Sequence, residues 1–222
     1  TWWRGLTRGW TVPAKGAAKP TRRYYRKLGW AAARFGLFTD LAMFFVGGKL
    51  KVKGNLTGRY ADVLAWMLLG FSALRRFEAE GRRAEDLPLV HYSLQLALAK
   101  MQAGFEGIYA NFPGPLGAVL RVVGLPLLRL NSLGRLPSDD LGNQAAVIAQ
   151  KWDAQTERLL ADIHLPETDA PGHGRLMRAF RLVCDAEPLI TKLKAAQKAG
   201  TLTAGEPDSL VAEARAAGVL SN

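Results

Sequence analysis

Apolar residues recur at steps of three and four through most of the first half of the chain, which is the spacing of amphipathic helices. The first helix is expected at residues 21–46, where Thr21 is placed to cap its start and Gly47–Gly48 to end it. The next segment starts at Asn55 or Thr57, and its apolar residues occupy more than one helical stripe: Tyr60, Val63, Leu64, Met67, Leu68, Phe71, Leu74 and Phe77. We therefore expect this second helix to be the central and most buried one.

A third long helix is predicted from Leu87 to about Ala110, because Pro88 fits the first turn of a helix, where a missing N–H costs nothing. The connections between the three helices are short, and short connections place long helices antiparallel in a bundle. Residues 111–135 are also apolar, but they are interrupted by Pro113, Pro115 and Pro126.

The remainder of the chain has weaker periodicity. Ser138 and the two aspartates after it favour a helix over Leu141–Asp162, which is followed by a linker at Pro166–Gly174 and two or three shorter helices. No segment alternates like a strand, so the sequence predicts an all-α fold, a helical bundle of three long helices plus shorter C-terminal helices. The predicted parts are an irregular basic arm with tryptophans (1–20), a helical domain (21–165) and a divergent helical tail (166–222).

Positive charge is concentrated near the start of the chain, whose net charge is +11. Residues 1–60 contain 13 Lys/Arg and one acid, Asp40, whereas residues 61–222 contain 17 Lys/Arg and 18 acids. Such a block attracts anions such as lipid headgroups, nucleic acid or the phosphates of coenzyme A, unless it is only a solvated face. No apolar run reaches the roughly 18 residues of a membrane span. The single Cys184 excludes an internal disulfide and suits a reducing compartment.

Two clusters of basic residues are candidates for contact with anions. One alternates with tyrosines near residue 24, and the other follows the end of the first helix. With two arginines of the apolar 111–136 segment they are predicted to lie on an anionic membrane surface. The alternative is that residues 111–136 cover an apolar face of another domain. The candidate residues are Arg22, Arg23, Arg26, Lys27, Lys49, Lys51, Lys53, Arg121 and Arg129. Nucleic acid is not expected as a partner, because no nucleic-acid-binding module is recognisable.

An ordered set of short motifs spans residue 3 to about residue 150 and resembles the C-terminal region of the bacterial FadE-type fatty acyl-CoA dehydrogenases. Beyond Lys151 the resemblance is loose. The motifs are Trp3-Arg4-Gly5-Leu6-Thr7-Arg8-Gly9, Arg23-Tyr24-Tyr25, Asp40-Leu41-Ala42-Met43, Gly47-Gly48-Lys49-Leu50-Lys51, Asp62-Val63-Leu64, Leu74-Arg75-Arg76-Phe77-Glu78, Gly81-Arg82, Asp86-Leu87-Pro88-Leu89-Val90-His91, Asn111-Phe112-Pro113 and Pro137-Ser138-Asp139-Asp140-Leu141.

The resemblance implies a place in an FAD-dependent enzyme that introduces an α,β double bond into medium- or long-chain acyl-CoA, the first step of fatty acid β-oxidation. It implies as partners the catalytic domains of the dehydrogenase, acyl-CoA and an electron-transferring flavoprotein, and it leaves room for a homodimer. In the family the flavin site and the catalytic glutamate precede the region that this chain resembles. No catalytic, cofactor-binding or metal-binding residue is therefore assigned here, and FAD is expected to be bound outside this chain.

Two glutamates that stand before or near glycine superficially match the glutamate–glycine pair of that family. Glu106 lies near the end of the third helix and Glu80 at a helix stop among four arginines. A catalytic base needs an apolar pocket against the flavin, so we interpret both as structural. His91 is interpreted in the same way, as a packing or capping group.

The expected role is structural support, dimerisation or membrane docking of the dehydrogenase, in the bacterial cytoplasm or peripheral on the inner face of the cytoplasmic membrane. The alternative is a stand-alone basic helical module that binds anionic membrane lipids. Both hypotheses assign a membrane-binding role to the basic residues. They differ in whether the chain is part of a flavoenzyme.

Overall fold

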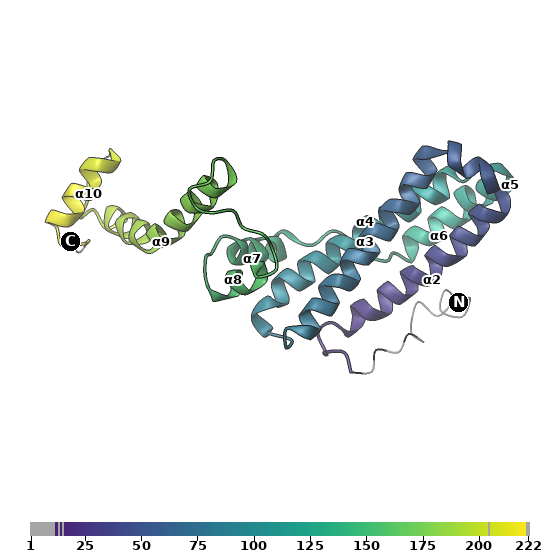
Figure 1. Ribbon diagram of the computed structural model, residues 1–222, viewed down its shortest axis with the longest axis horizontal. Helices are drawn as coiled ribbons and strands as arrows, with labels where there is room; N and C mark the ends of the chain where they lie inside the picture. Colours follow the sequence, from purple (N-terminus) through teal and green to yellow (C-terminus); the bar gives the residue numbers. More distant parts are fainter. Residues whose placement is uncertain (1–11, 13, 15, 204, 221–222) are drawn as a thin grey trace. The chain divides into compact units, whose positions relative to one another are not determined.

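The computed structural model of the chain describes residues 12, 14, 16–203 and 205–220, and their regular structure is helical, as predicted (Figure 1). Most of the predicted arm, residues 1–11, 13 and 15, lies outside the described residues. The chain divides into two compact units, Thr1–Ala146 and Val147–Asn222. Within the described residues, each helix is too short or too polar to cross a membrane.

The first unit is a helical bundle built from three long helices and a fourth, interrupted one. The long helices are α2 (Arg22–Phe45), α3 (Gly54–Ala79) and α4 (Leu87–Asn111). They are joined by the short 3₁₀-helices η1 (Gly47–Val52) and η2 (Ala84–Asp86). Helices α3 and α4 pack together along their length, α2 packs on both, and the segment after α4 packs back on α4. The three predicted long helices are thus present, with bounds close to those expected from the sequence.

The prediction that the second helix is central is wrong, because α4 occupies that position. Its residues Leu94, Met101 and Phe105 are fully buried, and α4 contacts α2, α3 and the following helical segment. Helix α3 buries one face, through Val63 and Leu74 among others. Its opposite face exposes four large apolar side chains, which are Leu64, Leu68, Leu69 and Phe71. A helix with apolar residues on more than one face is central only if other helices of the same fold cover each of those faces.

Residues 111–135 form more regular structure than their prolines suggest. Helix α5 (Gly114–Val119), the π-helical turn η3 (Leu120–Gly124) and α6 (Leu125–Leu130) follow one another without a gap. Pro126 lies in the first turn of α6, directly after the π turn. Because a proline inside a helix clashes with the carbonyl four residues earlier, a wider turn at this point lets the chain continue in one direction.

The second unit contains the C-terminal helices. Helix α7 (Asp139–Ala149) crosses the boundary between the units and is followed by α8 (Ala154–Leu160), α9 (His173–Lys198) and α10 (Pro207–Ala216). The single helix expected over Leu141–Asp162 is wrong: the Asp153 carboxylate accepts from the Thr156 backbone N–H at 3.0 Å and starts a new helix. Helix α9 has 26 residues and is thus longer than the sequence suggested.

Candidate functional site

The nine candidate basic residues do not form one patch, because helix α2 separates them. Arg22, Arg23, Arg26 and Lys27 lie in its first two turns, whereas Lys49, Lys51 and Lys53 follow its C-terminal end. A helix of 24 residues is about 36 Å long at 1.5 Å per residue. The two clusters therefore lie at opposite ends of the bundle. A small contact surface on one partner can include one cluster but cannot include both.

The cluster at the start of α2 is largely engaged within the fold. An Arg23 Nη donates to the Tyr24 hydroxyl at 2.7 Å, and that hydroxyl lies 2.9 Å from His91 Nδ1. Lys27 donates to the Leu133 backbone carbonyl, and its partial burial lowers the pKa of its ammonium group. These side chains hold α2 against α4 and the segment after α6, and the imidazole of His91 packs as the sequence suggested. These contacts occupy N–H donors of Arg23 and Lys27, but the acceptors are neutral, so the contacts limit the freedom of the two side chains without cancelling their charge.

The cluster after α2 is exposed and lies beside exposed apolar side chains. Lys49, Lys51 and Lys53 are exposed on and just after η1. The Phe44 side chain is 82% exposed and that of Val52 is 84% exposed. We call this surface the basic–apolar end; it consists of Met43, Phe44, Phe45, Lys49, Lys51, Val52 and Lys53.

The basic–apolar end carries an excess of positive charge. No acid occurs in the sequence between Asp40 and Asp62, or between Glu106 and Asp139. The N-terminus of α3 begins here, and the positive end of its helix dipole adds to the charge of the lysines. A surface hollow of about 490 Å³ lies at this helix start and is lined in part by Lys53, Arg59 and Asn111. The end thus combines exposed apolar rings with cations.

Arg121 and Arg129 differ in their surroundings. Arg121 Nε donates to the Ala110 backbone carbonyl at 3.1 Å, which places it where α4 ends. Arg129 Nε lies 3.0 Å from a Glu106 carboxylate oxygen, and Gln102 donates to the other oxygen at 2.9 Å. The charge of Arg129 is therefore partly balanced within the fold, whereas that of Arg121 has no carboxylate partner among the described residues.

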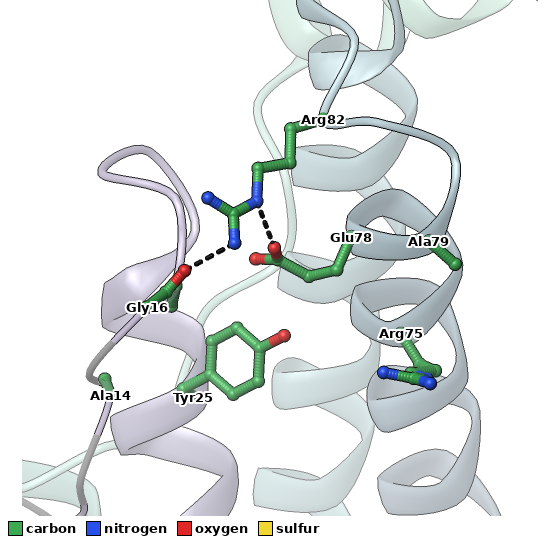
Figure 2. Close-up of a pocket in the computed structure, with 8 residues that line it drawn as sticks. Ala14, Gly16, Tyr25, Arg75, Glu78, Ala79 and Arg82 are labelled. Atoms are coloured by element: carbon green, nitrogen blue, oxygen red, sulfur yellow. Dashed lines mark hydrogen bonds and ion pairs between the residues drawn. The ribbon is translucent and has the colours of Figure 1, made fainter.

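Glu78, Glu80 and Glu106 are each paired with an arginine. Glu106 pairs with Arg129, and Glu80 with Arg76 on the same face of α3. Figure 2 shows Glu78, which accepts from Arg82, while Arg82 also donates to the Gly16 backbone carbonyl. These ion pairs fasten the turn after α3 and the end of α4.

The residues present do not fit a flavin site. The hollow in Figure 2 has a volume of about 450 Å³, opens to solvent and is lined by Arg75, Glu78 and Arg82 beside Tyr25. Another hollow of about 490 Å³ is lined by Tyr92, Leu96 and the polar start of α7. An isoalloxazine ring needs an enclosed, mainly apolar slot with a few placed polar groups. Neither of these two hollows, nor the one beside Lys53, has that lining.

The exposed apolar residues of the basic–apolar end were missed as functional candidates. Met43, Phe44, Phe45 and Val46 are four consecutive apolar residues at the end of α2. Because successive residues of a helix point about 100° apart, one packing face cannot bury all four. Val46 is buried and the other three are exposed. That run of apolar residues before a glycine pair was the signal available in the sequence.

Comparison with known proteins agrees with the resemblance found in the sequence. The family model described as "Acyl-CoA dehydrogenase, C-terminal, bacterial type" matches residues 1–222, the whole of this chain. No solved structure matches the chain. The sequence resemblance became loose beyond Lys151, but the family model also matches the rest of the chain. The second structural unit is therefore included in the family match. The chain belongs to the family of bacterial-type acyl-CoA dehydrogenase C-terminal domains.

Proposed function

We propose that this chain is the non-catalytic helical domain of an FAD-dependent acyl-CoA dehydrogenase and holds that enzyme on an anionic membrane surface. The enzyme would oxidise acyl-CoA to enoyl-CoA and pass electrons to an electron-transferring flavoprotein. Family membership supports the enzyme class. The pairing of Glu78, Glu80 and Glu106 with arginines supports a non-catalytic role for this part. FAD, when bound elsewhere in the enzyme, would accept the hydride.

The observation that carries membrane docking is the basic–apolar end. Lysines near an anionic bilayer surface contribute about 1 kcal/mol each, so Lys49, Lys51 and Lys53 together would contribute about 3 kcal/mol. The exposed ring of Phe44 and the side chain of Val52 can enter the interface between headgroups and acyl chains, which removes apolar area from water. Neither the charge attraction nor the insertion of apolar side chains gives stable binding alone, and both groups of residues lie at the same end of the bundle.

The test is binding of the whole polypeptide to lipid vesicles, measured by co-sedimentation. The variant Lys49→Glu/Lys51→Glu/Lys53→Glu should lose binding to vesicles that contain phosphatidylglycerol. A matched control changes three exposed lysines of α9, Lys192→Glu/Lys194→Glu/Lys198→Glu, which alters the net charge by the same amount. Phe44→Ser should weaken binding without changing the dependence on salt.

Equal losses in the two triple variants would show that binding follows net charge and not this surface. Binding of the unmodified protein to neutral and anionic vesicles alike would also contradict the proposal, because the lysines would then have no role. If docking fails in this way, the assignment to the dehydrogenase is unaffected, since it rests on the family match.

A further inference from the structure

Helix α3 presents a second exposed apolar surface, which differs in chemistry from the basic–apolar end. Residues 63–74 contain no charged side chain. The outer face carries Leu64, Leu68, Leu69 and Phe71, whose side chains are 50%, 65%, 56% and 38% exposed. Between them lie the small exposed residues Ala61, Ala65 and Ser72. An apolar patch of this kind on a soluble domain is characteristic of an interaction surface. We call it the α3 outer face.

Three residues on one flank of this face form a row with opposite charges at its ends. Asp62, Leu69 and Arg76 are spaced seven residues apart. Seven residues make almost two full helical turns, so these side chains lie nearly above one another, about 10 Å apart along the axis. Asp62 is exposed, Leu69 is 56% exposed, and the Arg76 side chain is 40% exposed. Along the helix axis this row thus has an acidic side chain, then a leucine, then a basic side chain.

Such a row is complementary to itself when two helices run antiparallel. A two-fold axis through Leu69 maps that residue onto its own copy and brings the acidic end of each row to the basic end of the other. We propose that the α3 outer face is the site at which a second copy of this chain binds, with the two α3 helices antiparallel. Asp62 would then pair with Arg76 of the partner subunit, twice in one symmetric interface.

The composition of the face fits a protein helix better than a lipid surface. Asp62 lies at one end of the face and Arg75 and Arg76 at the other, and Arg76 also pairs with Glu80, so the face carries charges of both signs rather than a basic cluster. Ala65 and Ser72 leave room for two helix backbones to approach closely, and Leu64 and Phe71 can fill the flank. Arg76 already pairs with Glu80, but a guanidinium has five N–H donors and can serve two carboxylates. This inference is independent of the proposed membrane docking.

Site-specific cross-linking in the whole polypeptide tests the interface. In a Leu69→Cys variant the two introduced thiols would face each other across the two-fold axis, so mild oxidation should join two copies of the peptide that contains position 69. Mass spectrometry of the digested product identifies that link. The control is Lys100→Cys, an exposed position on α4, which should give no such link. Cys184 lies in the second unit and is replaced by serine in both variants.

Two results of this experiment would overturn the proposal. If position 69 is joined to another part of the polypeptide, or is shielded from a maleimide without forming the symmetric link, the catalytic domains cover the face. If position 69 reacts freely with maleimide and gives no more link than position 100, the face has no partner.

Charge reversal gives an independent test of the antiparallel register. Asp62→Arg makes both ends of the row basic and should slow cross-linking at position 69 by about tenfold. Arg76→Asp makes both ends acidic and should have a similar effect. The double variant restores an opposite pair at each end, so its cross-linking rate should recover to within about threefold of the original. Circular dichroism checks that each variant keeps its helices. A double variant as slow as the single ones would contradict this register.

Discussion

Two leucines of α3 give a direct test of which face of that helix the bundle buries. Leu74 is fully buried against the core, whereas the Leu68 side chain is 65% exposed. A Leu→Ala change removes three carbon atoms, worth about 0.8 kcal/mol each when buried, or about 2.4 kcal/mol in all. At Leu74 the cavity left behind adds to this, so unfolding should become easier by about 3–4 kcal/mol. At Leu68 only about a third of the side chain is buried, and the expected loss is about 0.8 kcal/mol.

The assay is urea unfolding followed by circular dichroism, with the free energy extrapolated to zero denaturant. Because Leu68 lies on the proposed dimer face, the measurement is made at two protein concentrations and the lower one is compared. Leu74→Ala should lower the midpoint several times more than Leu68→Ala. Equal losses at the lower concentration would refute the burial of one α3 face, and with it the conclusion that α4 and not α3 is central.

Three other changes test contacts inside the first unit. Burial lowers the pKa of the His91 imidazole below its usual value of about 6.5, so the stabilisation that depends on the neutral ring is complete above that pH and is lost as the pH falls through the lowered value. His91→Gln should flatten the dependence of the urea midpoint on pH below about 6.5, measured by urea titrations at a series of pH values. Glu106→Ala should cost about 1–2 kcal/mol because the Arg129 guanidinium and the Gln102 amide lose their acceptor, whereas a loss under about 0.3 kcal/mol would show that the contacts are not formed. Tyr60→Phe removes the hydroxyl that donates to a buried α2 carbonyl at 2.9 Å and should cost about 1 kcal/mol in the same assay.

The three long helices could be predicted from the sequence because the residues that start and end a helix lie close to it in the chain. Pro88 lies in the first turn of α4, and Gly47 adopts a φ of +54° just past α2, a conformation that favours glycine. The break at Asp153 was not predicted, because a carboxylate that caps a new helix competes with continued periodicity. The exposure of one apolar face of α3 was not predicted either, since the sequence of a helix does not reveal whether a second apolar face is covered within the same fold.

The candidate site was predictable only in part, because charge clusters are local while their surroundings are not. Lys49, Lys51 and Lys53 are exposed, as their pattern suggested. The pairing of Arg129 with Glu106 joins residues 23 positions apart, and the contact of Lys27 with Leu133 joins residues 106 positions apart. No spacing rule in the sequence reveals such contacts. The length of α2 then separates in space two clusters that belong to the same basic quarter of the sequence.

The most direct test of the central claim is the size and cofactor of the native polypeptide that carries this sequence. An antibody raised against the chain is used to isolate that polypeptide from extracts of the source cells. We predict a mass well above the 24.2 kDa of this chain, a bound flavin, and bleaching of the flavin absorbance on addition of palmitoyl-CoA. A flavin-free protein of 24.2 kDa would contradict it and would identify the chain as a separate helical module.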